Sequence, residues 1–317
     1  MTDSLNLTSL GASDVQVSRL GIGTWQWGDV LVWGYGRGTY TDADLKLAFE
    51  AALATGLNWF DTAELYGLGR SETLLGEFMR ASSRPVVVAS KFMPLPWRVR
   101  RSSLVKALRG SLARLGLKRV DVYQIHWPFP PRSVETWANA LADAVEAGLT
   151  RAVGVSNYDL EQMRRAHDAL ARRGVPLASN QVEYSLLHRR PERSGLLAAC
   201  RDLGVALIAY SPVGKGMLTG KYTPAHPPPG TRGRSWRGKR LSQIQPLVDA
   251  LRQLGERHGG KTPSQVALNW LMRKGALPIP GVKNALQTRE NAGALGWSLT
   301  PDDVAALDAA SDGSLRA

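Results

Sequence analysis

Short apolar segments alternate along the chain with longer segments in which apolar residues recur at the period of a helix. Strand–helix units in strict alternation predict an α/β protein whose parallel strands close into a (β/α)8 TIM barrel. The predicted strands are Leu20–Thr24, Asn58–Asp61, Val86–Lys91, Val120–His126, Arg151–Ser156, Leu177–Gln181, Val205–Tyr210 and Leu277–Pro280. The predicted helices are Thr41–Thr55, Glu72–Arg80, Arg101–Arg114, Val134–Ala147, Leu160–Arg173, Gly195–Leu203, Pro263–Arg273 and Ala285–Ala294.

Residues at the helix ends support this alternation. Thr41 and Asp42 can cap the first helix, and Gly56 follows its end. Gly148 and Gly174 end two later helices in the same way, since glycine readily adopts the left-handed conformation found there.

An open doubly wound sheet is the competing α/β architecture, and glycine-rich loops would favour it. Gly21–Gly23 leads into Thr24 without a third glycine, and Gly67–Gly69 has Glu72 where that glycine belongs. A Walker-type phosphate loop fails as well, because Gly220–Tyr222 places a tyrosine where serine or threonine is required. The failure of these motifs favours the closed barrel.

The 317 residues are read as a single barrel domain spanning 1–317, because α/β barrels of this length are one domain. Two segments lie outside the alternation. The residues before Leu20 predict a short N-terminal β-hairpin. The Pro- and Gly-rich stretch Pro224–Arg240 predicts a long loop, and Ser242–His258 an additional helix, at the C-terminal face of the barrel.

The formal net charge of +13 permits a polyanionic partner, an anionic small molecule, or no more than good solubility. The densest basic cluster, Arg232–Arg240, lies in the long loop. No stacking-aromatic or helix-turn-helix pattern accompanies the charge, which argues against nucleic acid as a partner.

The chain shows no secretory signal and no apolar stretch that approaches the ~20 residues needed to span a bilayer. We therefore expect a cytoplasmic protein that does not enter a membrane. Cys200 is the only cysteine, so an intramolecular disulfide is impossible and no metal site is expected.

Four ionisable residues stand at or just after the ends of three successive predicted strands. Asp61 ends the second strand, Tyr66 follows in its loop, Lys91 ends the third strand and His126 ends the fourth. The C-terminal strand ends of such a barrel meet at the active site. Lys91 is costly to bury alone, and Asp61 on the adjacent strand can supply its counter-ion.

These residue types suit the reduction of a carbonyl group, which needs a hydride and a proton for the developing alkoxide. A nearby ammonium group stabilises a phenolate, so Lys91 would lower the pKa of Tyr66 and make it a better acid. His126 can orient the carbonyl oxygen, while Asp61 holds Lys91. Each residue alone has an ordinary alternative: a helix cap, a loop aromatic, a solvated lysine or a core histidine.

The motifs Asp61–Gly67, Asp121–Pro128 and Gly154–Asn157 resemble those of the aldo-keto reductase superfamily, and the similarity extends from Val17 to Trp297. The resemblance implies a (β/α)8 barrel that binds NADPH or NADP+ in an extended form without a Rossmann domain. The implied catalytic residues are Asp61, Tyr66, Lys91 and His126.

The resemblance also implies a set of cofactor contacts. Ser156, Asn157 and Gln181 match positions that bind the nicotinamide carboxamide, and Tyr210 matches the aromatic residue that stacks on its ring. A loop from Ser211 to Lys221 resembles the one that covers the pyrophosphate. The full implied set is Gly23, Thr24, Trp25, Ser156, Asn157, Gln181, Tyr210, Ser211, Pro212, Val213, Gly216, Leu218, Gly220, Lys221, Gly281, Lys283, Gln287, Glu290 and Asn291.

The segment after the last strand resembles the site for the adenosine ribose phosphate. Where one branch of the family has lysine directly after the proline, this chain has Gly281, and Gln287 replaces an arginine. The chain is thus more similar to the branch of potassium-channel β subunits and bacterial and plastid reductases. Lys283, beside a helix N-terminus, can compensate, so we expect NADPH over NADH.

Four tryptophans near C-terminal strand ends are expected to line a flat apolar substrate pocket: Trp25, Trp27, Trp97 and Trp127. Such walls suit aromatic carbonyl compounds. Arg98, Arg100 and the basic loop would favour an anionic aldehyde, and pyridoxal-type compounds are one possibility.

The sequence therefore predicts an NADPH-dependent carbonyl reductase acting on a small molecule. The alternative is a redox-sensing regulatory subunit that holds NADPH and turns over slowly. A monomer and a homo-oligomer both remain open.

Overall fold

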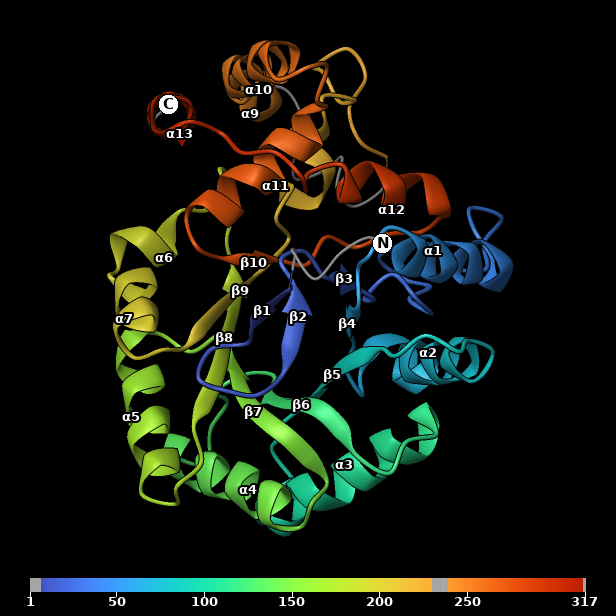
Figure 1. The fold of residues 1–317 in the computed structure, drawn as a ribbon, viewed down its shortest axis with the longest axis vertical. Helices are drawn as coiled ribbons and strands as arrows, with labels where there is room; N and C mark the ends of the chain where they lie inside the picture. Colours follow the sequence, from blue (N-terminus) through green and yellow to red (C-terminus); the bar gives the residue numbers. More distant parts are fainter. Residues whose placement is uncertain (1–6, 230–235, 237–238, 316–317) are drawn as a thin grey trace.

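The computed structural model describes residues 7–229, 236 and 239–315, so part of the basic cluster Arg232–Arg240 lies outside the described residues. Its centre is a curled parallel sheet in the order β10-β9-β8-β7-β6-β5-β4-β3 (Figure 1). The strands are β3 Ile22–Gly23, β4 Trp59–Asp61, β5 Val87–Phe92, β6 Val120–Ile125, β7 Thr150–Ser156, β8 Leu177–Glu183, β9 Ala206–Tyr210 and β10 Leu277–Pro278.

The sheet closes on itself between its first strand and the segment after its last. Gly21 N donates to Pro278 O at 3.0 Å, and Gly23 N donates to Pro280 O at 3.0 Å. Gly23 also forms an isolated parallel bridge with Gly281. These contacts complete the predicted barrel.

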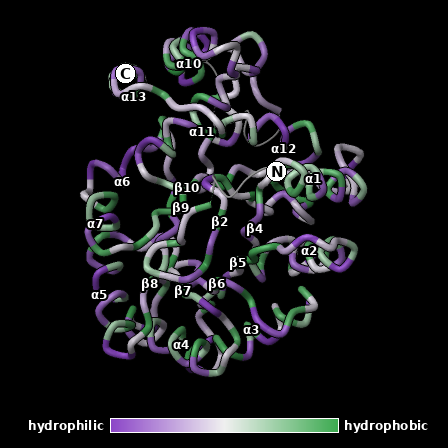
Figure 2. Tube along the Cα trace, viewed as in Figure 1, coloured by the Kyte–Doolittle hydropathy of each residue, from purple (hydrophilic) through white to green (hydrophobic). Residues whose placement is uncertain are grey.

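A ring of helices surrounds the barrel and follows the predicted alternation (Figure 1). These helices are α1 Asp42–Ala54, α2 Arg70–Arg80, α3 Ser102–Leu115, α4 Val134–Glu146, α5 Leu160–Ala171, α7 Leu196–Asp202, α11 Pro263–Arg273 and α12 Ala285–Ala292. In Figure 2 the outer turns of α5 are largely hydrophilic, whereas the helix faces toward the strands supply the main apolar core.

The helix-end signals read from the sequence are confirmed. Thr41 is the N-cap of α1 and forms a capping box with Asp44. Gly56, Gly148 and Gly174 follow helix ends with φ values of 82°, 67° and 67°. Glycine is favoured at these positions because residues with a Cβ atom rarely adopt such angles.

Several elements lie outside the strand–helix alternation. The additional helix predicted at Ser242–His258 is divided into two, and its second part begins with Pro246 in the first turn, where a missing N–H costs no hydrogen bond. Among the described residues, the sequence did not predict α6 Arg190–Arg193, α13 Pro301–Leu315 or the two 3-10 helices. The additional elements are α6 Arg190–Arg193, the 3-10 helices η1 Tyr66–Gly69 and η2 Gly214–Thr219, α9 Lys239–Gln243, α10 Gln245–Arg257 and α13 Pro301–Leu315.

The predicted N-terminal hairpin is present and crosses one opening of the barrel (Figure 1). Its strands, β1 Leu7–Ser9 and β2 Gln16–Ser18, pair antiparallel. Leu10 and Val17 from the hairpin region are fully buried and pack with the interior strand residues Trp59 and Ile208. The hairpin thus closes the N-terminal end of the barrel, which leaves the C-terminal end for a site.

Within the described part of the chain, no helix has the length and apolar character needed to cross a membrane.

Candidate active site

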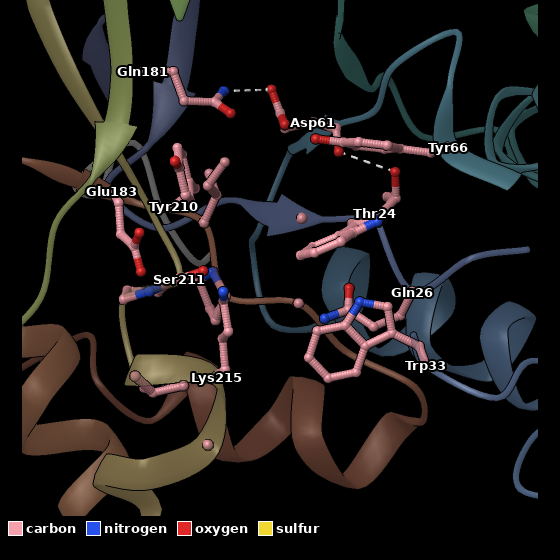
Figure 3. A pocket seen from close by; sticks show the side chains of 18 of the residues that line it. Thr24, Gln26, Trp33, Asp61, Tyr66, Gln181, Glu183, Tyr210, Ser211 and Lys215 are labelled. Atoms are coloured by element: carbon pink, nitrogen blue, oxygen red, sulfur yellow. Dashed lines mark hydrogen bonds between the residues drawn. The ribbon is translucent and has the colours of Figure 1, made fainter. Parts of the chain in front are cut away.

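A cavity of about 910 Å³ opens at the C-terminal ends of the barrel strands. Figure 3 shows side chains from β4, β8, β9 and the loop after β3 converging on it. The four residues expected to perform chemistry come from the β4, β5 and β6 ends; Asp61, Tyr66 and His126 line the cavity, and Lys91 lies behind them. The strand alternation therefore brings them together as the sequence suggested.

Lys91 is completely buried and makes three hydrogen bonds. Its Nζ forms an ion pair with Asp61 Oδ1, donates to Thr62 O at 2.9 Å and reaches Tyr66 Oη at 3.3 Å. Burial alone would lower the pKa of the ammonium group, but the charge of Asp61 and the contact with Tyr66 outweigh burial and raise that pKa. Lys91 is therefore held in its charged form.

The second carboxylate oxygen of Asp61 is occupied by two amides. Gln181 Nε2 donates to Asp61 Oδ2 at 2.8 Å, a contact visible in Figure 3. Gln124 Nε2, fully buried on β6, donates to the same oxygen at 3.2 Å. Since both oxygens of Asp61 are engaged, its carboxylate is fixed in orientation. Sequence reasoning missed Gln124, although its place two residues before His126 puts it on the interior face of a strand.

Tyr66 lies in the turn between β4 and α2, and this turn depends on Gly67. Gly67 has φ 56°, and a Cβ atom there would lie 2.7 Å from the Gly28 backbone. The pKa of Tyr66 is raised, because burial disfavours the phenolate more than Lys91 favours it. Lys91 does lower the pKa of Tyr66, as the sequence suggested. The expectation of a lowered pKa is nevertheless wrong, because burial raises it by more.

The ring of His126 meets the ring of Tyr66 edge to face, with centroids 5.7 Å apart and an interplanar angle of 79°. Its backbone N donates to Phe92 O at 2.8 Å, which fixes the chain at the end of β6. Burial and the nearby charge of Lys91 lower the pKa of His126 to about 3. The imidazole is therefore neutral near neutral pH and can donate one hydrogen bond without carrying charge.

A second group of polar side chains lies beside these residues at the ends of β7, β8 and β9. Ser156 Oγ donates to Gln181 O at 2.8 Å, and Asn157 Nδ2 donates to His126 O at 3.0 Å. Tyr210 Oη donates to Asn157 Oδ1 at 2.9 Å. These bonds fix the Tyr210 ring at the cavity wall and connect this group to His126.

The far end of the cavity is built by η2 and by the segment that leads into α12. Lys283 Nζ donates to Trp33 O and Lys283 N donates to Gln287 Oε1, both at 2.8 Å. Asn284 caps α12 by accepting from Gln287 N at 3.0 Å. A lysine and a helix N-terminus thus meet here, an arrangement that favours anions.

Most residues expected to contact a cofactor line this cavity. They are Gly23, Thr24, Trp25, Ser156, Asn157, Gln181, Tyr210, Ser211, Pro212, Val213, Gly216, Lys221, Gly281, Lys283, Gln287, Glu290 and Asn291. Leu218 does not; it is completely buried in the apolar core. Gly220 also lies outside the lining, and its carbonyl accepts from Arg252 Nη2 at 2.8 Å.

Two of the four tryptophans expected in a substrate pocket are placed elsewhere. Trp27 is fully buried, and its Nε1 donates to Val282 O at 3.1 Å, so it fastens the loop after β3 to the segment after β10. Trp97 is 73% exposed and lies outside the cavity lining. Sequence position near a strand end could not distinguish these directions.

Trp25 and Trp127 do line the cavity, and the structure adds Trp33 to them. Trp25 and Trp33 meet edge to face with centroids 5.6 Å apart, and Trp127 stacks on Phe129 at 5.5 Å. Trp33 was missed because it lies in an irregular loop ten residues after β3. The cavity is therefore aromatic on the side of Tyr66.

Arg98 forms an ion pair with the largely buried Glu64 and lies 5.2 Å from the ring centroid of Phe92. It does not line the cavity. Its guanidinium group is therefore neutralised by Glu64 within the loop. This geometry does not support the expectation that Arg98 attracts an anionic substrate.

Comparison with known proteins agrees with this fold and identifies the family. The model of the Aldo/keto reductase family matches residues 19–312. The chain is 44% identical to "Pyridoxal reductase, chloroplastic" from Arabidopsis thaliana over 308 residues, covering 93% of this chain and 83% of that protein. It is 30% identical to the "NADH-specific methylglyoxal reductase" of Escherichia coli, covering 93% and 95%.

Solved structures are similar over the whole barrel. The glycerol dehydrogenase from Gluconobacter oxydans has a TM-score of 0.84 at 27% identity, covering 97% of this chain and 95% of that one. A thermostable aldo-keto reductase in complex with epalrestat has a TM-score of 0.78 at 30% identity, covering 96% and 99%. The chain belongs to the aldo/keto reductase family and is an oxidoreductase of that family.

The buried ion pair generates a stability prediction. Asp61→Asn should lower the free energy of unfolding by about 3–5 kcal/mol, because it leaves Lys91 buried without a counter-ion. The double variant Asp61→Asn/Lys91→Met should regain much of that loss, since no buried charge remains. Urea unfolding of the three proteins measures this directly.

The matched control is Glu50→Gln, which removes the partner of the exposed Lys46, 3.8 Å away. An exposed pair of this kind contributes at most ~0.5 kcal/mol. If Asp61→Asn lowers the free energy of unfolding by no more than this control does, Asp61 and Lys91 are not a buried pair that depends on charge.

Proposed function

We propose that this protein is an NADPH-dependent reductase that converts aldehydes or ketones to alcohols, with Tyr66 as the general acid. The observation that carries the proposal is the contact of Lys91 Nζ with both Asp61 and Tyr66 Oη at the edge of the cavity. A buried ammonium group beside a phenol favours loss of the phenolic proton at the moment when a carbonyl oxygen gains negative charge.

The side chains divide the work of proton transfer. Tyr66 donates its Oη proton to the alkoxide oxygen, and Lys91 stabilises the phenolate that remains. Neutral His126 hydrogen-bonds the carbonyl oxygen and orients it toward Tyr66. Asp61 keeps Lys91 charged throughout. Bound NADPH supplies the hydride from its nicotinamide C4.

The residues around Tyr210 fit a nicotinamide. An aromatic ring at the wall offers a stacking surface, and the amides of Asn157 and Gln181 offer polar contacts next to it. Because Gln181 uses Nε2 for Asp61, its Oε1 is the atom left to accept a hydrogen bond from a carboxamide N–H. This division of the Gln181 amide supports the assignment of the nicotinamide to this part of the cavity.

The preference for NADPH is part of the proposal. Lys283 and the N-terminus of α12 supply a cation and backbone donors at the far end of the cavity, where a ribose phosphate would be bound. One relative is named as NADH-specific, so the family does not settle the preference by itself.

The substrate is proposed to be an uncharged or weakly charged aromatic aldehyde, and pyridoxal is a specific candidate. The tryptophans Trp25, Trp33 and Trp127 provide flat apolar surfaces on the side of Tyr66. The similarity to a plant pyridoxal reductase supports the same choice.

Tyr66→Phe tests the mechanism. We expect turnover of pyridoxal or an aryl aldehyde to fall by ~10²–10⁴-fold, because the proton donor is lost, while NADPH binding changes little. The decrease of NADPH absorbance measures the rate, and fluorescence titration measures binding. Tyr158→Phe is the control: it removes a buried phenol hydroxyl outside the cavity lining and should leave turnover unchanged. Near-normal activity in Tyr66→Phe would refute Tyr66 as the acid.

The cofactor preference is tested by comparing kcat/KM for the two nicotinamide nucleotides. We expect NADPH to exceed NADH by at least about tenfold, and Lys283→Met to reduce kcat/KM for NADPH more than for NADH, because the lost charge faces a phosphate only in NADPH. Lys46→Met, on the outer surface of α1, serves as the charge control. An equal or better value with NADH in the wild type would reject the preference.

A further inference from the structure

Gln26 lies in the loop after β3, where its backbone is fixed from both sides. Tyr40 Oη donates to Gln26 O at 2.5 Å, and Trp27 N donates to Thr24 O at 2.9 Å. Trp27 points into the core and bonds to Val282 O. With the backbone held in this way, the side chain of Gln26 lines the cavity next to Trp33 (Figure 3).

The carboxamide of Gln26 lies directly over Gly281, across the seam where the barrel closes. A Cβ atom on residue 281 would collide with both Nε2 and Oε1 of Gln26. Gln26 therefore occupies the space that a side chain at position 281 would need. The backbone of Gly281 has no positive φ that would require a glycine, so the Gln26 carboxamide is the group that occupies the space at this position.

The polar end of Gln26 has unmet hydrogen-bonding capacity. Gln26 is 8% exposed, and its Oε1 is buried without a hydrogen-bond partner among the described residues. A buried polar atom without a partner is unfavourable, and such an atom at a cavity wall indicates a contact that a ligand completes.

The surroundings identify the kind of ligand group. Gly281 leads within two residues to Lys283, and Lys283 Nζ donates to the backbone of Trp33, the neighbour of Gln26 in the cavity. Lys283 and the α12 N-terminus favour a phosphate, and a carboxamide can accept from a sugar hydroxyl while donating to a phosphate oxygen.

We propose that Gln26 is a cofactor-binding residue that takes the place of a side chain at position 281 and hydrogen-bonds the ribose phosphate of the adenosine half of the dinucleotide. This inference rests on the proposed use of NADPH. In this arrangement the loop after β3 contributes Gln26 to the adenosine end of the site, whereas Gly281 and Lys283 come from the segment after β10.

Two variants remove this contact by different routes. Gln26→Met keeps the length of the side chain and removes its polar atoms. Gly281→Ala adds a Cβ atom that must displace the Gln26 carboxamide, and this is tolerable for the fold because the displaced atoms are the far end of a flexible side chain. Gly110→Ala is the matched control, since its Cβ would meet only the end of Arg114 at 3.5 Å.

The probes are NADP+ and 2′-phospho-ADP-ribose, which is the same nucleotide without nicotinamide, titrated by calorimetry. We expect Gln26→Met and Gly281→Ala each to weaken both probes by about tenfold, and the control to leave them unchanged. The double variant should be no weaker than either single one, because both remove the same contact. Thermal unfolding of each variant confirms that the fold is intact.

Wild-type affinity for both probes in Gln26→Met would overturn the inference while leaving the proposed function in place. Weakened binding of NADP+ without any effect on 2′-phospho-ADP-ribose would also overturn it, because Gln26 would then act at the nicotinamide end. A wild-type protein that binds neither NADP+ nor NADPH would contradict the proposed function itself.

Discussion

The buried ion pair between Asp61 and Lys91 is the interaction on which the site depends. A fully buried ammonium group is stable only where its charge is balanced and its protons are bonded, and Asp61, Thr62 O and Tyr66 meet this need. The pair in turn requires two adjacent parallel strands, β4 and β5, ending at the same edge. Gln124 and Gln181 then fix Asp61 from the other side of the barrel interior. Fold and proposed chemistry are therefore specified by the same contacts.

The closure of the barrel determines where a ligand can bind. The hairpin fills the N-terminal opening with apolar side chains, and the cavity formed by the described residues opens at the C-terminal end. At that end the seam between β3 and the segment after β10 is narrow, with Gly23 and Gly281 paired across it. Trp27 strengthens the seam from the core side, and Gln26 occupies it from the cavity side. Of these two adjacent residues, Trp27 therefore stabilises the barrel closure and Gln26 lines the cavity.

The sequence predicted the strands well because they are short apolar runs, most of which end in a polar residue, as in the segment ending at Lys91. It also predicted that four ionisable residues meet, since barrel topology makes successive strand ends neighbours. It could not predict the direction of side chains in irregular loops. Trp27 was expected in the cavity but is buried in the core, and Trp97 is exposed on the surface. Trp33 and Gln26, which were not expected there, line the cavity. The net pKa of Tyr66 was missed because burial depends on packing that no motif encodes.

In the proposed mechanism, the Lys91-supported hydroxyl of Tyr66 and the nicotinamide of the cofactor meet in this one cavity. A crystal structure of the protein with NADP+ tests it most directly. We expect the nicotinamide ring to lie against Tyr210, with C4 facing the space between Tyr66 Oη and His126. A nicotinamide bound away from Tyr210, with Tyr66 out of reach of any carbonyl placed over C4, would contradict it.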